Sequence, residues 1–267
     1  MTTKTAIVTG CSTGIGRATA LELTARGYEV VATARRLESI ADLGVARTLV
    51  LDVDSDDSVT AAFDAVGPVD VLVNNAGFGI EGPVESVPLE DVRRAFETNF
   101  FGATRMIQAF APAMRQRGSG AIVNVTSVAG VVAGPFAGFY AATKFALEAL
   151  SEALHLEMGH FGVKVLVVEP GSIATEFGTN MIDLRTAAGP YGPLATQWEG
   201  AMSTLSGGAE APGPDLVANA IADALETDGH PLRLPVGVDA QLITSTRQAS
   251  DYETFEASMR QVLQLEW

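Results

Sequence analysis

The stretch that decides the fold is TAIVTGCSTGIG, residues 5–16. Its first five residues predict a short buried strand, and the glycine-rich turn after it leads directly into a helical pattern over 15–26. Glycines let a backbone approach a pyrophosphate closely, and the N-terminus of a helix offers free N–H groups. The phosphates of a dinucleotide are therefore expected against Gly10, Ser12, Thr13, Gly14, Ile15 and Gly16. The spacing is G-x3-G-x-G rather than G-x-G-x-x-G, and the alternative is a turn that binds no ligand.

The rest of the chain repeats this alternation of strand and helix. Further strands are expected at 29–33, 48–51, 69–73, 121–125, 164–168 and 232–234, and further helices at 55–65, 89–117, 139–160 and 214–225. The strands are apolar almost throughout, which is typical of a parallel sheet covered on both faces. The predicted fold class is α/β: a single domain, residues 1–267, with a doubly wound Rossmann-type parallel sheet of about seven strands and helices on both faces. Such sheets bind ligands at the carboxyl ends of their strands.

The composition excludes several kinds of partner. The 267 residues are 47% hydrophobic and carry a net charge of −15. Nucleic acids and anionic membranes repel such a surface, so neither is expected as a partner. The uncharged run 118–143 is interrupted by glycines and polar residues, which predicts a buried strand and a turn that lines a pocket rather than a membrane span.

Cysteine and histidine usage points to a compartment and excludes a metal. The single cysteine, Cys11, rules out an intrachain disulfide and fits a reducing, cytoplasmic location. The first residues contain no long apolar region, so no signal peptide is expected. His155, His160 and His230 lack the spacing of metal ligands, and no metal site is predicted.

Two arginines follow the second expected strand, where a fold that binds NAD usually carries an acidic residue. Arg35 and Arg36 suit a 2′-phosphate instead, which predicts NADP(H); the alternative is that both are solvated loop charges. After the third strand, Asp52 is expected to bond the adenine through its carboxylate, and Val53 through its backbone. A turn or helix-capping role is the alternative for Asp52.

The fourth expected strand ends in NNAG, residues 74–77. Asparagine side chains can brace neighbouring backbone segments, and Gly77 permits a close approach to the ribose of a cofactor. We therefore expect Asn75, Ala76 and Gly77 at the cofactor, although the same residue types also occur in plain turns.

Tyr140 and Lys144 are four residues apart, which on a helix places both side chains on one face. An ammonium beside a phenol favours the phenolate, so the pKa of Tyr140 is expected to fall below its ordinary value of about 10. A phenol of that kind can donate and accept a proton near neutral pH. The alternative is a packed ring beside a solvated amine.

Taken together with Asn99, Ser127 and the pair Pro170-Gly171, these motifs resemble the short-chain dehydrogenase/reductase family in its compact soluble form. The resemblance extends over nearly the whole chain. It includes the TGxxxGIG and NNAG motifs, the YxxxK motif, and a serine thirteen residues before the tyrosine. It implies an oxidoreductase that acts on CH–OH groups with NADP(H), and a homodimer or homotetramer.

The resemblance also implies a role for each matching residue. Tyr140 donates a proton to the substrate carbonyl or accepts one from the alcohol, and Ser127 holds the substrate oxygen. Lys144 binds the nicotinamide ribose and lowers the pKa of the tyrosine, while Asn99 helps to hold a water in the proton relay. The turn that carries Pro170, Gly171, Ile173 and Thr175 meets the carboxamide of the nicotinamide.

The segment 175–214 interrupts the rhythm, since it is long and rich in glycine and proline. Long irregular insertions in compact domains are usually functional or mobile, which predicts a substrate lid. Together with Ser127 and Tyr140, the residues Phe78, Phe136 and Phe177 are expected to contact a substrate with a sizeable apolar body. The alternative is that these rings pack against the core or a partner subunit.

Two function classes remain open from the residues alone. One is an active NADP(H)-dependent oxidoreductase that interconverts a carbonyl compound and its alcohol. The other is a catalytically silent NADP(H)-binding regulator or scaffold on the same fold, because fold alone does not fix function. The intact set of Asn99, Ser127, Tyr140 and Lys144 favours the enzyme, since a sensor needs no proton-transfer groups.

Overall fold

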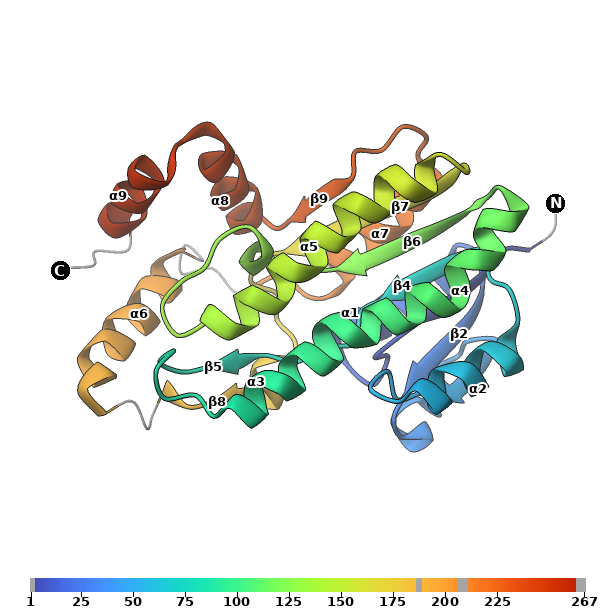
Figure 1. Cartoon of the computed structure of the whole chain (residues 1–267), viewed down its shortest axis with the longest axis horizontal. Helices are drawn as coiled ribbons and strands as arrows, with labels where there is room; N and C mark the ends of the chain where they lie inside the picture. The colour runs from blue at the N-terminus through green and yellow to red at the C-terminus, as the bar shows by residue number, and fades with distance from the viewer. Residues whose placement is uncertain (1–2, 186–188, 206–210, 263–267) are drawn as a thin grey trace.

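The computed structural model describes residues 3–185, 189–205 and 211–262, and it confirms the predicted fold class. Seven parallel strands form one sheet in the order β3-β2-β1-β4-β6-β7-β9 (Figure 1). They are β1 (Thr5–Val8), β2 (Glu29–Ala34), β3 (Arg47–Val50), β4 (Val71–Asn74), β6 (Gly120–Val125), β7 (Val163–Pro170) and β9 (Arg233–Val236). The strand order reverses between β1 and β4, and a crevice at their carboxyl ends is the usual place for a ligand.

Helices cover both faces of this sheet. One face carries α1 (Gly14–Ala25) and α7 (Asp215–Glu226), and the other carries α2 (Asp56–Val66), α4 (Ala103–Arg117) and α5 (Gly138–Gly159). Side chains of β1 alternate between the two faces of the sheet. Ala6 and Val8 belong to the apolar layer under α1 and α7, and Ile7 belongs to the layer under α2, α4 and α5. Burial on both faces explains why the strands lack the polar alternation of a half-exposed sheet.

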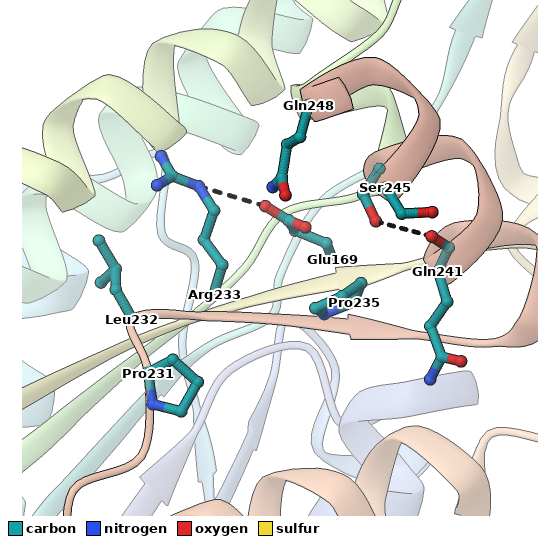
Figure 2. Close-up of a pocket in the computed structure, with 9 residues that line it drawn as sticks. Glu169, Pro231, Leu232, Arg233, Pro235, Gln241, Ser245 and Gln248 are labelled. Carbon is teal, nitrogen blue, oxygen red and sulfur yellow. Dashed lines mark hydrogen bonds and ion pairs between the residues drawn. The ribbon is translucent and has the colours of Figure 1, made fainter. Parts of the chain in front are cut away.

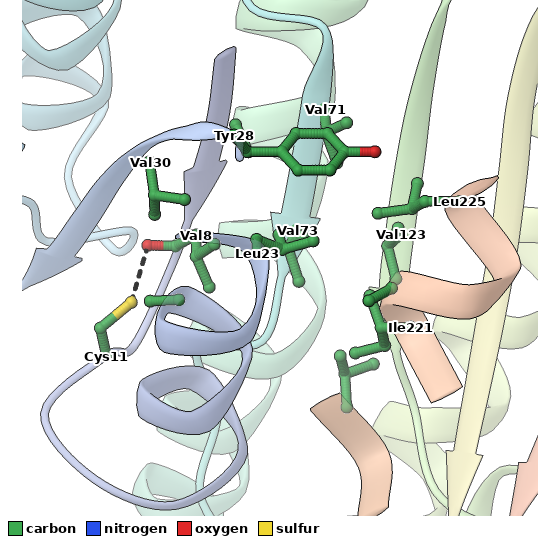
Figure 3. Packing of buried hydrophobic residues seen from close by; sticks show 14 of the residues in the cluster. Val8, Cys11, Leu23, Tyr28, Val30, Val71, Val73, Val123, Ile221 and Leu225 are labelled. Atoms are coloured by element: carbon green, nitrogen blue, oxygen red, sulfur yellow. Dashed lines mark hydrogen bonds between the residues drawn. The ribbon is translucent and has the colours of Figure 1, made fainter. Parts of the chain in front are cut away.

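Figure 3 shows the apolar layer beneath α1 and α7, where Leu23 and Ile221 pack with strand side chains such as Val8. Cys11, the only cysteine of the chain, is completely buried in this layer. Its thiol donates a hydrogen bond to the Val8 carbonyl at 3.2 Å. Burial raises the pKa of the Cys11 thiol to about 12, so the side chain behaves as a small apolar core residue.

The helix predicted over 89–117 is present without a break, but it is not α-helical throughout. It is divided into α3 (Leu89–Phe96), a π-helical segment (Glu97–Gly102) and α4. The π segment lies against the turn after β3, and a Cβ added at Gly102 would lie 2.7 Å from Cγ2 of Val53. Short π segments inside helices occur frequently at functional sites, and periodicity alone does not reveal them.

The segment 175–214 is more regular than the sequence predicted. The two-residue strand β8 (Ile182–Asp183) pairs with β5 (Ile80–Glu81), and the helix α6 (Gly192–Leu205) follows it. Two-residue strands are too short for a periodic pattern, and the glycine and proline that open α6 are typical of loops. Residues 186–188 and 206–210 of the predicted lid lie outside the described residues.

After β9 the chain forms α8 (Val238–Ala249) and α9 (Tyr252–Val262), which lie at the same end of the molecule as α6 (Figure 1). The helix α8 contacts the short 3-10 turn at Val128–Gly130, which directly follows Ser127. Within the described part of the chain, no helix has the length and apolar character that crossing a membrane requires.

Candidate active site

A cavity of about 800 Å³ opens at the carboxyl ends of the strands. Most of the predicted site residues line it, namely Gly10, Ser12, Thr13, Gly14, Ile15, Arg35, Arg36, Asp52, Val53, Asn75, Ala76, Gly77, Phe78, Ser127, Tyr140, Lys144, Pro170, Gly171, Ile173, Thr175 and Phe177. The three predicted residues that do not line the cavity are Gly16, Asn99 and Phe136. Segments distant in sequence therefore meet at one site because parallel strands end at the same edge of the sheet.

The glycine-rich turn after β1 has the geometry of a phosphate-binding loop. Gly10 and Gly14 have φ angles of 72° and 56°, which favour glycine, and a Cβ at Gly10 would lie 2.9 Å from Cα of Ala76. Gly16 lies beneath the loop, where a Cβ would collide with the Asn75 side chain and the Gly10 carbonyl. The N-cap residue of α1, Thr13, makes no side-chain capping bond, which leaves the first N–H groups of the helix for an anion.

Two side chains hold the ends of β1 and β4 together. The Thr9 hydroxyl oxygen accepts hydrogen bonds from the Asn75 and Ala76 N–H groups, each at 3.0 Å. The Asn75 side chain adds a third bond in the same direction, because its Nδ2 donates to the Thr9 carbonyl at 2.9 Å. These three bonds fix the two turns against each other, as expected for an asparagine that braces backbone. Thr9 was not among the predicted site residues, since a threonine at a strand end carries no distinctive signal.

Lys144 lies within the site, but the pKa of Tyr140 is not lowered below its ordinary value as predicted. Its Nζ donates to the Val125 carbonyl at 3.1 Å and lies 5.7 Å from the centroid of the Tyr140 ring. Burial raises the pKa of Tyr140 to about 12, although the hydrogen bond with Ser127 lowers it. The expectation of a lowered tyrosine pKa is therefore wrong for this structure, because desolvation of the phenolate outweighs the stabilising contacts.

Ser127 caps the 3-10 turn that follows β6. Its hydroxyl oxygen accepts from the Ala129 N–H at 3.1 Å, and the same hydroxyl lies 3.5 Å from the Pro170 carbonyl. The serine thus lies between the ends of β6 and β7, and its hydroxyl also forms a hydrogen bond with the Tyr140 side chain. A hydroxyl and a phenol at this spacing can share one substrate oxygen.

Asn99 lies in the π segment and is 1% exposed. Its Oδ1 accepts from the Phe78 N–H at 3.0 Å, and its Nδ2 donates to the Phe78 carbonyl and the Thr143 hydroxyl at 2.9 and 3.1 Å. A Cβ at Gly77 would lie 3.0 Å from Asn99 Oδ1, so the asparagine also requires a glycine beside it. The amide holds the turn after β4 against α5, and a role in water binding stays a prediction.

Arg35 and Arg36 follow β2 at the opposite end of the cavity from Tyr140, and both are exposed. Within the described residues, neither guanidinium makes a hydrogen bond or ion pair. Asp52 is occupied in a turn, since its Oδ1 accepts from the Asp54 N–H at 3.2 Å. Two unpaired guanidiniums at a cavity rim form a local positive patch on a chain whose net charge is −15.

The wall beside Tyr140 is partly apolar. The Phe177 ring lies 5.7 Å from the Tyr140 ring, centroid to centroid, and Phe78 lines the same wall. Phe136 differs from the prediction, because it is 6% exposed, does not line the cavity and packs edge-on against Tyr191. Its ring supports the neighbouring segment rather than the cavity surface.

Two acidic residues of the site were not foreseen. Glu81 lines the cavity and pairs with Arg185 at 2.9 Å, and its charge acts on Tyr140. Asp239, in the first turn of α8, accepts a hydrogen bond from the Ser172 N–H at 2.7 Å and occupies the space where a Cβ of Gly171 would lie. Neither residue belongs to a recognisable motif. Each is held in the site by a partner that is distant in sequence, Arg185 for Glu81 and Ser172 for Asp239.

Among the described residues, no group of three or more His, Cys, Asp or Glu side chains is arranged to hold a metal ion. The cavity therefore offers a glycine loop with an open helix N-terminus, a pair of arginines, and a serine, tyrosine and lysine at the opposite end. This combination suits a long ligand with phosphates in the middle and a reacting group beside the tyrosine.

Comparison with known proteins gives a consistent result. The model of the short chain dehydrogenase family matches residues 4–184. The uncharacterized oxidoreductase YbbO of Escherichia coli strain K12 is 36% identical over 241 residues, which cover 87% of this chain and 85% of that protein. Human retinol dehydrogenase 8 is 42% identical over 187 residues, which cover 65% of this chain and 60% of that protein.

Solved structures agree with these matches. A short chain dehydrogenase from Burkholderia cenocepacia J2315 in complex with NADP superposes with a TM-score of 0.78 at 28% identity, over 96% of this chain and 97% of that chain. Several other similar structures are also complexes with NADP or NADPH.

Proposed function

The chain belongs to the short-chain dehydrogenase/reductase family, and from that premise we propose that it is an NADP(H)-dependent oxidoreductase. It interconverts a carbonyl compound and the corresponding alcohol. The observation that carries this proposal is the single cavity that joins the glycine loop to Ser127, Tyr140 and Lys144. A protein that only sensed the cofactor would need the loop but not the three proton-handling side chains.

The cavity fits the proposed cofactor. Gly10, Gly14 and the open N-terminus of α1 would hold its phosphates, because both glycines have positive φ angles and a Cβ at Gly10 would lie 2.9 Å from Cα of Ala76. The loop after β7 and Lys144 would hold its nicotinamide ribose and carboxamide. A bound nicotinamide supplies or accepts the hydride, so the protein itself needs to provide orientation and proton transfer.

The side chains support proton donation. With its pKa raised to about 12, Tyr140 keeps its proton at neutral pH and can donate it to a carbonyl oxygen. Ser127 holds the same oxygen by a hydrogen bond and restricts its position relative to the phenol. Burial lowers the pKa of Lys144 to about 8, which leaves the side chain largely as an ammonium at neutral pH. That cation stabilises the negative charge that develops when Tyr140 gives up its proton.

NADP(H) is favoured over NAD(H) by Arg35 and Arg36. Both guanidiniums are exposed at the cavity rim, which leaves their donors available to a 2′-phosphate. Several similar structures are NADP or NADPH complexes, which supports the same choice. The matching test is the double variant Arg35→Ala with Arg36→Ala. It should weaken NADPH binding far more than NADH binding, and an equal loss for both would remove the arginines from cofactor choice.

The substrate proposed is a ketone, aldehyde or secondary alcohol with a sizeable apolar body. Phe78 and Phe177 line the cavity beside Tyr140, together with Val128 and Met181. Segment 175–214 is proposed as the lid over this end, held in place by the β5–β8 pairing. A similar relative is a retinol dehydrogenase, and its name is consistent with an apolar substrate.

A homodimer or homotetramer is the proposed assembly. Large apolar side chains stay exposed on and around α5, among them Phe145, Leu156 and Phe161. A contiguous exposed apolar surface marks an association face, and these side chains are proposed to contribute to one. Light scattering after size-exclusion chromatography measures the mass directly, and a monomer at micromolar concentration would contradict this part of the proposal.

The decisive experiment follows NADPH oxidation against a panel of apolar aldehydes and ketones, with NADH in parallel. Tyr140→Phe should keep NADPH affinity within about threefold and lose nearly all turnover, since it removes only the proton donor. Tight NADPH binding without turnover of any substrate in the panel would favour the silent regulator instead. Unchanged turnover in Tyr140→Phe would exclude the tyrosine from the reaction.

A further inference from the structure

Glu148 is a buried carboxylate that none of the roles above uses. It lies one helical turn beyond Lys144 on α5, and each of these two residues is 5% exposed. Burying a carboxylate is costly unless hydrogen bonds and opposite charge compensate it. A glutamate at this position therefore needs a physical reason.

Both oxygens of the Glu148 carboxylate have partners. The Thr126 hydroxyl donates to Oε1 at 2.7 Å, and Arg233 Nε donates to Oε2 at 3.0 Å. Thr126 directly precedes Ser127, and a Cβ at Gly130 would lie 3.0 Å from Cγ of Glu148. The carboxylate thus fills the space beneath the turn that carries Ser127.

Arg233 extends these contacts to the next strand. Figure 2 shows its guanidinium directed toward Glu169, with Nε 3.3 Å from Glu169 Oε1. Glu169 is 1% exposed and directly precedes the Pro170-Gly171 turn of the cavity. Glu148 is therefore in contact, directly or through Arg233, with the segments that carry Ser127, Lys144 and the β7 turn.

We propose that Glu148 is a positioning residue for the reaction, whose buried negative charge keeps Lys144 protonated and whose contacts hold the Ser127 turn in place. This inference rests on the proposed function, in which the Lys144 cation assists proton donation by Tyr140. It assigns the charge of Glu148 a role that a neutral side chain of the same shape would not fulfil.

The charged groups around this carboxylate come from three elements. They are Lys144 and Glu152 on α5, Glu169 on β7, and Arg233 on β9. Burial raises the pKa of Glu148, while the Thr126 hydrogen bond and the Arg233 charge lower it. Burial lowers the pKa of Lys144 to about 8, and the charge of Glu148 acts in the opposite direction. Removing that charge leaves burial unopposed, so the ammonium should be lost at a lower pH.

The test is Glu148→Gln, measured as the pH dependence of kcat/KM for NADPH, which reports ionisations of the free enzyme. Glutamine keeps the shape and can still accept from Thr126. We expect the alkaline limb to move to lower pH by about one unit, the size expected for a unit charge one turn away in a partly screened interior. At pH 8.5 the kcat/KM of the variant should then be about eightfold below that of the wild type, and at pH 6.5 less than twofold below it, as a single ionisation requires.

Glu152→Gln is the matched control. Glu152 pairs with the same guanidinium at 3.0 Å, but its side chain is 57% exposed and lies two turns from Lys144. Its alkaline limb should stay in place. Provided that the wild type turns over, the inference would be overturned by equal shifts of the alkaline limb in both variants. An alkaline limb that does not move in Glu148→Gln would overturn it as well. Absence of turnover in the wild type is a different result, since it would refute the proposed function itself.

Should Glu148→Gln fail to fold, Thr126→Val replaces it. That variant removes the hydroxyl that bonds Glu148 Oε1 beneath the Ser127 turn and leaves the carboxylate charge, so kcat should fall while the alkaline limb stays in place. An unchanged kcat in a folded Thr126→Val enzyme would then overturn the positioning role.

Discussion

The buried carboxyl of Glu169 should make the stability of this protein depend on pH in a way that one substitution removes. The residue is 1% exposed, and its Oε1 has no hydrogen-bond partner among the described residues, although Arg233 Nε lies 3.3 Å from it as an ion pair. Burial raises its pKa from an ordinary 4.5 to about 7; the neighbouring Glu148 acts in the same direction, and the charge of Arg233 opposes both. The folded protein therefore favours the protonated form of this carboxyl.

The magnitude follows from the two pKa values. Below pH 4.5 the carboxyl is protonated in both the folded and the unfolded chain, and its ionisation costs nothing. Above pH 7 it is ionised in both, and the folded state bears the full cost of a buried charge. A difference of about 2.5 between 4.5 and 7 corresponds to roughly 3 kcal/mol at 1.36 kcal/mol per pKa unit. Stability from this group is thus present at low pH and lost as the pH rises through 7.

Urea unfolding of the wild type and Glu169→Gln, at pH 5 and pH 8 and at one protein concentration, measures this cost. The variant should gain roughly 2–3 kcal/mol of unfolding free energy relative to the wild type between the two pH values. Arg233 keeps Glu148 and Glu152 as partners, so the substitution does not leave it unpaired. An equal difference at both pH values, or a larger one at pH 5, would refute the reasoning.

Three further substitutions test other parts of the site. Gly16→Ala should lower the unfolding free energy by roughly 1–3 kcal/mol and weaken NADPH binding, because its Cβ has no room beneath the loop. Unchanged urea midpoints would contradict this. Gly134→Ala should raise KM for bulky substrates several-fold at unchanged NADPH affinity, since its Cβ would lie 2.5 Å from the Trp198 ring of α6. A KM that stays constant across substrate sizes would mean that α6 does not border the substrate. Asp239→Ala should weaken NADPH binding about tenfold, from the loss of a charge-assisted hydrogen bond to Ser172 of roughly 1.5 kcal/mol. Fluorescence titration checks this, and an unchanged Kd would confine Asp239 to packing.

The sequence predicts the sheet and the glycine loop well, because both depend on local residues. Each of the seven expected strands is present, and the turn at Gly10 and Gly14 has the positive φ angles that only glycine adopts readily. Strand ends carry the motifs, so knowing the strands also predicts which motifs meet. Local pattern and topology together were sufficient to bring Ser127, Tyr140 and Lys144 into one cavity.

Other features depend on packing that no local pattern encodes. The pKa of Tyr140 is set by the burial of its ring, which the spacing to Lys144 does not reveal. Asp239 reaches Ser172 across 67 residues of chain, and Phe136 leaves the cavity surface because it packs with Tyr191. The β5–β8 pair is only two residues long and depends on tertiary contacts for its existence.

The burial of Cys11 has a practical consequence for the study of this protein. A thiol that is fully buried, with a pKa of about 12, reacts slowly with maleimides and similar reagents at neutral pH. A cysteine introduced at an exposed position of α6, such as Glu199→Cys, would then be the only readily labelled thiol. A fluorophore attached there would report movement of this helix during turnover, without prior removal of the native cysteine.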